Sequence, residues 1–266
     1  MGKRVAILLL ALLVSCLAIM GYFLMQGRES LFTDPYKAIS PKACIVIETV
    51  SLQSFMNSLT TGKGLFGEVG RIKEFDSFSR KLNYLSDQIN KAGFKKILND
   101  GAAVISFYPT EEGKLQPLLT MTIPGEIRYR QVKEVLRSAG ISEVIVSKSG
   151  GNSLLKIPFS VNSRKDTAYI SLISGLLLIS SSEKIIEEAQ IQTGRENDIR
   201  SLPGFSRVLL ASGKNEDKIF VVFTNLFRFF KSVLGKEGQW LAEKISKLAG
   251  TGEGDIYINE DGLVLS

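Results

Sequence analysis

The chain has 266 residues, which is enough for one large domain or two small ones. Its 33 Lys and Arg residues against 27 Asp and Glu give a formal net charge of +6 without a long basic block, so the composition argues against a nucleic-acid binder. The chain has no histidine and only two cysteines, Cys16 and Cys44, which excludes Ser-His-Asp triads, Cys-His pairs and the usual zinc sites of histidine or four cysteines.

An uncharged apolar run occupies residues 5–25, behind a short tail of residues 1–4. As a helix its 21 residues extend about 31 Å, close to the thickness of the hydrocarbon core of a bilayer. Lys3 and Arg4 precede the run, and the positive-inside rule therefore keeps the tail in the cytoplasm. We predict a transmembrane signal-anchor helix, with membrane lipid as its partner and with the following anchoring residues: Leu8, Leu9, Leu10, Leu12, Leu13, Leu17, Ile19, Tyr22 and Phe23.

The tetrapeptide at residues 13–16, Leu-Val-Ser-Cys, leaves two other interpretations open. It resembles a bacterial lipoprotein processing site, in which Cys16 would carry lipid, and a plain secretory cleavage site is the third interpretation. We prefer the retained helix because apolar residues continue without a charge beyond Cys16. All three interpretations place the main domain outside the cytoplasm, in the periplasm or the extracellular space.

The first elements after the apolar run are a stalk, a strand and two helices. Residues 26–41 are polar and contain two prolines, so we expect a stalk outside the core. Residues 43–50 form a β-branched strand, and residues 51–64 form a weak helix that ends in glycine. Residues 74–92 have apolar side chains at alternating steps of three and four, which predicts an amphipathic helix.

The middle of the chain predicts hairpins separated by helices. Residues 102–108 and 115–123 flank a polar turn, and Pro117 favours an edge position for the second of these strands. A helix follows over residues 129–139, and a second helix begins near Ser182. The glycine turns between these helices predict two further hairpins, centred on residues 150–152 and 174–175.

The last third predicts helices, one strand and a closing hairpin. We expect a short helix over 204–212, a strand over 218–223, helices over about 224–234 and 239–249, and a hairpin over 255–266. Ser266 falls within a predicted strand, which leads us to expect that the chain is truncated. The whole predicts an α+β domain over residues 42–266, with an antiparallel sheet and helices packed mainly on one face.

No motif in the sequence predicts catalysis, a cofactor or a metal. The glycines at 62–67 lack the spacing of a phosphate-binding loop, and residues 250–255 are interpreted as a helix cap and linker because they offer too few oxygen ligands for calcium. Adjacent carboxylates at 111–112, 187–188 and 260–261 do not predict the convergent pair that acid–base chemistry needs. Glu48, in an apolar strand, is the one carboxylate with a possible buried role, and Cys44 is interpreted as a core residue.

Aromatic residues near position 230 offer a candidate interaction patch. Phe223, Phe227 and Phe230 fall on one stripe and are expected in the core. Phe229 lies off that stripe and Trp240 lies in the next helix, so these two are the candidate residues for contact with a partner or with lipid, although core packing of the aromatic cluster is the favoured interpretation.

The order of elements resembles a bacterial family of membrane-anchored proteins that is catalogued only as a domain of unknown function. The resemblance rests on Ile39-Ser40-Pro41-Lys42-Ala43, the strand "CIVIETV", the segment "SLQSFMNSL", the later "SLPGFSRVL" and the strand "DIYIN". It covers residues 34–266 and implies an anchored extracytoplasmic domain, and it supplies no catalytic residues.

Together these patterns predict a non-enzymatic interaction or scaffold module of the bacterial envelope that binds an unidentified envelope protein. The alternative is an envelope carrier that holds a lipid or another apolar ligand between the sheet and the helices. The phenylalanine-rich segments favour this alternative.

Overall fold

The computed structural model describes the following residues: 34–52, 103–112, 114–123, 129–138, 141, 143–149, 152–161, 164–202, 204–212, 217–227, 238, 240, 243–244, 251–259 and 262–265. The predicted anchor over 5–25 with Cys16, most of the helices predicted over 51–64 and 74–92, and Phe229 all lie outside these residues.

The described residues form ten strands and a smaller number of helices. The strands are β1 (Ile45–Thr49), β2 (Ala103–Pro109), β3 (Leu115–Thr122), β4 (Ile145–Ser149), β5 (Asn152–Val161), β6 (Arg164–Ile173), β7 (Leu176–Ser180), β8 (Lys218–Val222), β9 (Thr251–Asn259) and β10 (Gly262–Leu265). The α-helices are α5 (Tyr129–Ser138), α6 (Glu183–Thr193) and α7 (Phe205–Ala211), and the 3-10 helices are η1 (Pro35–Ala38) and η3 (Ile199–Ser201).

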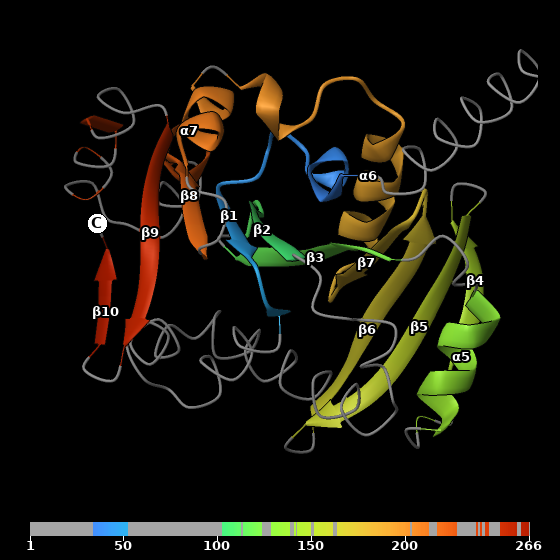
Figure 1. The fold of residues 1–266 in the computed structure, drawn as a ribbon. Coiled ribbons are helices and arrows are strands. Elements are labelled where there is room, and N and C mark those ends of the chain that lie inside the picture. The colour runs from blue at the N-terminus through green and yellow to red at the C-terminus, as the bar shows by residue number, and fades with distance from the viewer. Residues whose placement is uncertain are drawn as a thin grey trace, which may run out of the picture.

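All ten strands join one antiparallel sheet in the order β10-β9-β8-β1-β2-β3-β7-β6-β5-β4 (Figure 1). The predicted hairpins are confirmed, because β2 pairs with β3, β4 with β5, β6 with β7 and β9 with β10. The predicted α+β class with an antiparallel sheet is therefore correct. One connection was not predicted: β5 and β6 also form a hairpin, which makes β4 to β7 a continuous meander.

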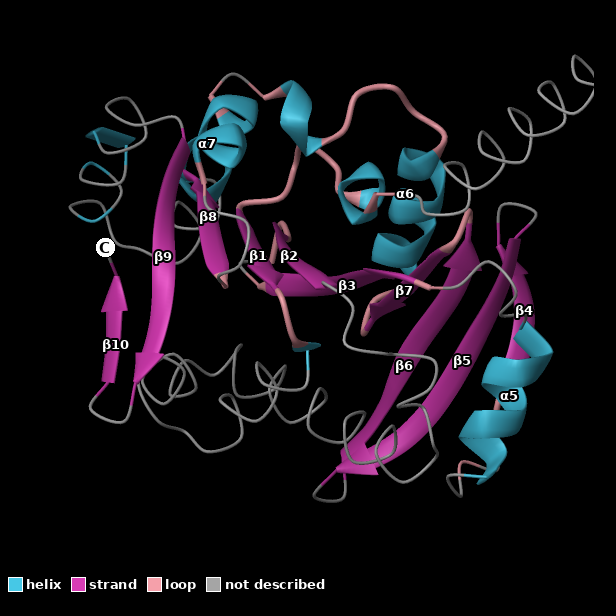
Figure 2. Cartoon of the chain, viewed as in Figure 1, coloured by secondary structure: helices cyan, strands magenta, loops and turns pink. Residues whose placement is uncertain are grey.

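Helices cover both faces of the sheet. On one face, η1, α6, η3 and α7 pack over alternate residues of the central strands, including Val46, Leu118 and Leu178 (Figures 1 and 2). On the other face, α5 contributes Val132 and Leu136 to a second cluster of buried residues. The prediction that helices pack mainly on one face thus holds for α6 and α7, whereas α5 lies on the opposite face.

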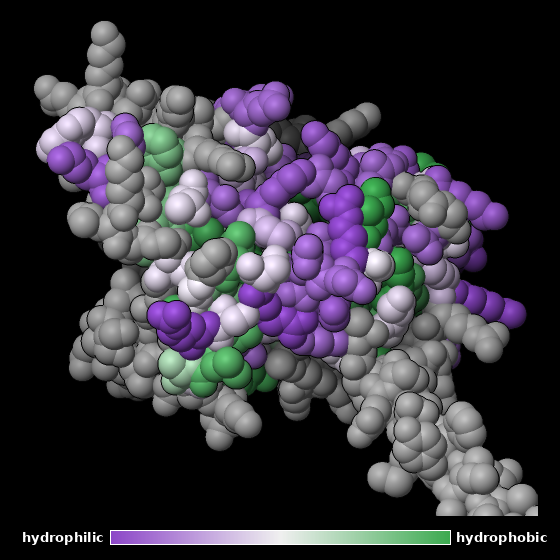
Figure 3. Space-filling model, turned by 90° about the horizontal axis from the view of Figure 1, so that it is seen from above, coloured by the Kyte–Doolittle hydropathy of each residue, from purple (hydrophilic) through white to green (hydrophobic). Residues whose placement is uncertain are grey.

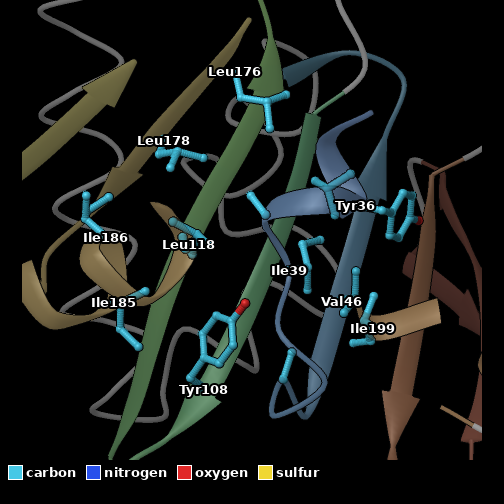
Figure 4. Packing of buried hydrophobic residues seen from close by; sticks show 14 of the residues in the cluster. Tyr36, Ile39, Val46, Tyr108, Leu118, Leu176, Leu178, Ile185, Ile186 and Ile199 are labelled. Carbon is cyan, nitrogen blue, oxygen red and sulfur yellow. The ribbon is translucent and has the colours of Figure 1, made fainter. Parts of the chain in front are cut away.

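The segment predicted as a stalk belongs partly to the core. Tyr36, Ala38 and Ile39 are buried, and they pack beside Val46 and Ile199 (Figure 4). Asp34 caps η1 by accepting a hydrogen bond from the Tyr36 N–H at 3.0 Å. The prediction of a stalk outside the core is therefore wrong for residues 35–39, because their apolar side chains fill the space between the sheet and the helices.

Pro117 lies in a central strand, so the predicted edge position of β3 is wrong. β3 lies between β2 and β7, and its pairing with β7 begins at Leu118. Pro117 therefore precedes the segment that pairs with β7, where its missing N–H does not interrupt that ladder. Its carbonyl accepts a hydrogen bond from Ser180 Oγ at 2.6 Å.

The predicted linker before the last hairpin is a strand. β9 begins at Thr251, and its first residues pair with β8 from Val222↔Thr251 to Lys218↔Asp255. The interpretation of residues 250–255 as a helix cap and linker is wrong over 251–255, because pairing with a neighbouring strand overrides the low strand propensity of glycine.

An approximate two-fold axis relates two parts of the sheet. β1 and β8 are antiparallel neighbours, and each pairs on its outer side with the first strand of a hairpin, β2–β3 or β9–β10. The axis passes between Val46 and Phe220, which face each other and pack in the same cluster. Leu52 and Leu226, which follow the two strands at equivalent positions, pack against the other cluster. The central sheet is therefore built from two similar halves.

Candidate functional site

Glu48, the one carboxylate that the sequence singles out, lies on β1 and is half-buried. Its Oε2 accepts a hydrogen bond from the Tyr36 hydroxyl at 3.0 Å. Burial and the neighbouring Glu48 carboxylate raise the pKa of Tyr36 above its usual range. The phenol therefore stays protonated and acts as a hydrogen-bond donor that holds η1 against the sheet.

A second set of charged side chains lies next to Tyr36. Arg200 donates to Asp198 Oδ1 through Nε at 3.0 Å and to Oδ2 through Nη2 at 2.5 Å, and its Nη1 donates to Asp34 Oδ2. Lys37 Nζ lies 4.0 Å from Asp198 Oδ2. Burial opposes ionisation of Asp198, but hydrogen bonds from the side chain and the backbone of Arg200 outweigh it and hold the pKa of Asp198 below its usual range.

Lys218 is the buried cation of this region. It lies opposite Glu48 in the pairing of β1 with β8, it is 4% exposed, and its Nζ donates to Ser212 Oγ at 3.2 Å. Asp34, Glu48 and Asp198 thus supply three negative charges close to the three positive charges of Lys37, Arg200 and Lys218. The contacts of Arg200 with Asp198 and Asp34 join η3 to the start of η1, and the Tyr36–Glu48 hydrogen bond joins η1 to the sheet.

The adjacent carboxylates do not converge within the described residues. Glu112 is exposed on the β2–β3 turn and pairs with Lys114 at 2.7 Å, while Glu188 on α6 lies 3.6 Å from Lys42 Nζ. Among the described residues, no group of three or more acidic, cysteine or histidine side chains is placed to hold a metal ion. The Cys44 thiol is buried and donates to the carbonyl of Phe107 at 3.3 Å, which confirms its interpretation as a core residue.

Of the predicted interaction patch, the structure describes Trp240. Its side chain is 62% exposed, and the ammonium of Lys244 lies 5.1 Å from the centre of the indole ring. Phe223 and Phe227 are half-buried and belong to neither cluster of buried residues, whereas Leu226 between them packs against one of these clusters. Trp240 is therefore an exposed aromatic residue with an adjacent cation, and the proximity of Phe229 to it stays a prediction.

The anchor residues predicted from the sequence lie outside the described part. Among the residues that are described, no helix has the length and the apolar content needed to cross a membrane. The transmembrane helix over 5–25 and the lipidation of Cys16 therefore stay predictions.

Sequence reasoning missed a site at the edge of the sheet. β4 is one of the two terminal strands in the sheet order, and its neighbouring residues Ile145 and Val146 are 56% and 50% exposed. Both side chains are large and β-branched, and they point to opposite faces of the strand. A signal was present in the sequence, because a lysine such as Lys148 inside a short apolar strand is typical of a sheet edge.

The face that carries α6 and α7 offers less apolar surface. Its described residues are mainly hydrophilic, and the hydrophobic side chains are separated into small areas (Figure 3). Leu210 on α7, 85% exposed, and Ile191 on α6, 57% exposed, are single exposed side chains of the kind that most soluble surfaces contain. The edge at β4 and the region of Trp240 are therefore the two candidate interaction surfaces.

Searches against protein-family models, curated proteins and solved structures found no match for this chain. The resemblance to a family of unknown function thus stays a prediction.

Proposed function

We propose that the protein is a single-pass, membrane-anchored module of the bacterial envelope that binds another protein and performs no catalysis. The observation that carries this proposal is the edge of the sheet at β4, the last of the described strands in the sheet order, where Ile145 and Val146 are exposed. Such an edge favours the addition of a strand from another protein. The exposed Trp240 supplies a second contact of the kind that is enriched at interfaces.

Membrane anchoring is supported by the sequence that precedes the domain. Residues 5–25 are uncharged, and only the eight residues 26–33 separate Met25 from Asp34, where the described domain starts. Lys3 and Arg4 favour a cytoplasmic tail, which directs the domain to the outside.

The interface between the sheet and the helices gives little support to the alternative carrier. Ile39, Val46, Leu118 and Leu176 are fully buried there, and Figure 4 shows their side chains directed into the space between η1, α6 and the strands. A carrier for an apolar ligand needs a cavity of about 300 Å³ or more in such a place. In the described part of this interface, these side chains form one buried cluster.

Photocrosslinking in membranes tests the interaction proposal. A photoreactive phenylalanine at Trp240 or Val146 should yield the same protein adducts in replicate membranes. The matched control is position 114, because the Lys114 side chain is 60% exposed but lies on the β2–β3 turn, away from both candidate surfaces. Adducts at 240 and 146 that do not exceed those at 114 would contradict the proposal.

A further inference from the structure

We infer that β4 pairs antiparallel with β4 of a second copy of this chain, with the two Ile145 residues facing each other. This inference rests on the proposed interaction function and names a second copy as the partner. The two ten-stranded sheets would join through their β4 edges into one continuous sheet.

The edge has the properties of a surface that is covered in the assembly. β4 pairs with β5 over Ile145↔Lys156 to Ser149↔Asn152, and none of the other described strands lies on its outer side. Backbone N–H and C=O groups on that side need partners, and water satisfies them in a single copy. Burial of Ile145 and Val146, both at least half exposed, would favour a strand over water.

Geometry restricts the register of a symmetric pair. Residues that face each other across two antiparallel strands project to the same face of the sheet, whereas neighbours in one strand project to opposite faces. A two-fold axis perpendicular to the sheet therefore passes between two copies of the same residue. The chain already contains this arrangement, because Val46 faces its counterpart Phe220 across the approximate axis between β1 and β8.

Side-chain chemistry selects Ile145 as the central residue. With Ile145 at the axis, Val146 faces Val144 of the other copy and Ser147 faces Glu143, so apolar residues meet apolar residues and no like charges stand opposite each other. With Val146 at the axis, Lys148 would face the apolar Val144 instead. This register is self-complementary, which is why the inference names a second copy as the occupant.

Disulfide crosslinking tests this register in the full-length protein. Ile145→Cys, in a chain that also carries Cys16→Ser, should form a covalent dimer on mild oxidation in membranes, because facing residues in antiparallel strands have Cα atoms about 4.5–5.5 Å apart, within disulfide range. Ser147→Cys should not, since its two copies would lie about 13 Å apart along the strands. The double variant with Glu143→Cys and Ser147→Cys should restore the dimer.

Leu210→Cys is the matched control, since Leu210 is 85% exposed and lies on α7. A dimer yield for Ile145→Cys no higher than that of Leu210→Cys would overturn the inference. Reproducible adducts from Trp240 in the same membranes would then leave the interaction function standing without self-pairing.

A second measurement does not depend on oxidation. Ile145→Lys should convert the dimer to a monomer in sedimentation experiments in detergent, whereas Leu210→Lys should leave the dimer intact. Both positions are exposed, so both variants should fold, and circular dichroism checks this. A monomeric parent protein at concentrations that match those in the membrane would also overturn the inference.

Discussion

The Tyr129 hydroxyl bonds backbone groups of β5 and β6 just beyond the point where these two strands stop pairing with each other. It accepts a hydrogen bond from the Leu172 N–H at 2.7 Å and donates to the carbonyl of Ser153, at the point where the pairing of β5 with β6 ends at Leu154↔Ser171. It also lies 3.2 Å from Ser171 Oγ, which accepts a hydrogen bond from Gln190 of α6 at 2.7 Å. One phenol therefore connects α5 on one face of the sheet with α6 on the other.

Tyr129→Phe should lower the free energy of unfolding by about 1–3 kcal/mol, because it leaves the Leu172 N–H and the Ser153 carbonyl without a partner. Urea unfolding measures this change. Tyr169→Phe is the matched control, since the Tyr169 hydroxyl has no hydrogen bond within the part of the chain that the structure describes. Equal losses in the two variants would contradict the role of the Tyr129 hydroxyl.

The Asp198 carboxylate predicts a pH dependence of stability. Its pKa is held below the usual value, so its contribution is fully present above about pH 4, the pKa of an unfolded Asp, and is lost as the pH falls through the lower folded value. Asp198→Asn should therefore reduce stability at pH 7 and have a smaller effect at pH 3. Unfolding midpoints at both pH values measure this, and an equal effect at both would be inconsistent with an ionised Asp198.

The burial of a single residue was predictable where it depends on the spacing of side chains within one helix. The helix predicted over residues 129–139 brings Tyr129, Val132 and Leu136 to one face by their steps of three and four, and the two aliphatic residues are buried. The hydrogen bonds of the Tyr129 hydroxyl depend on strands that lie far along the chain, so helical spacing carried no information about them. The hydrogen bonds of Glu48 to Tyr36 and of Arg200 to Asp34 were hidden because they join separate elements, whereas Arg200 and Asp198 are only two residues apart.

At the scale of elements, the hairpin between β6 and β7 has a turn that its sequence explains. Ser174 and Gly175 are its two central residues, with φ of 50° and 76°, and this geometry favours glycine or asparagine. Gly175→Ala should destabilise the protein by about 1–2 kcal/mol, the cost of a left-handed residue with a Cβ atom. Thermal unfolding should show this loss. Ser174→Asn, which tolerates the same region, should be neutral or slightly stabilising.

Phe220 lies on β8 next to the approximate two-fold axis, where it faces Val46 of β1 and packs in the same buried cluster. Its side chain is fully buried, and its ring lies 5.3 Å from that of Phe205. Phe220→Ala should cost about 3–5 kcal/mol, as truncation of a buried aromatic side chain does. Leu210→Ala, at an exposed position, should change stability by less than about 0.5 kcal/mol in the same chemical unfolding experiment. Similar losses in both would contradict the packing at the axis.

Elements with a clear local period were predicted, and elements that depend on distant pairing were not. The hairpins and the helices α5, α6 and α7 follow from apolar spacing and turn residues. The position of Pro117 in a central strand and the strand over 251–255 depend on which neighbours the sheet brings to them. The contribution of Tyr36 and Ile39 to the core likewise depends on a surface made by distant strands.

At the scale of the whole molecule, the order of the strands determines which residues form a surface. Ile145 and Val146 look like ordinary strand residues in the sequence, and they become a candidate interface because β4 is the last strand of the sheet. The sequence named Trp240 only as a candidate contact residue, and Lys148, the one local signal of an edge strand, does not show that the sheet of ten strands ends at β4. The interaction function proposed for the chain depends on this edge and on the anchor that precedes the domain.

The location of the domain outside the cytoplasm is the central claim, and thiol labelling in intact cells tests it. A chain with Cys16→Ser and Leu210→Cys presents one exposed thiol, because Cys44 is buried and burial raises the pKa of its thiol to about 12. A membrane-impermeant maleimide should label position 210 in spheroplasts without lysis, and the parent without Leu210→Cys should stay unlabelled. Labelling that occurs only after lysis would place the domain in the cytoplasm and contradict the account.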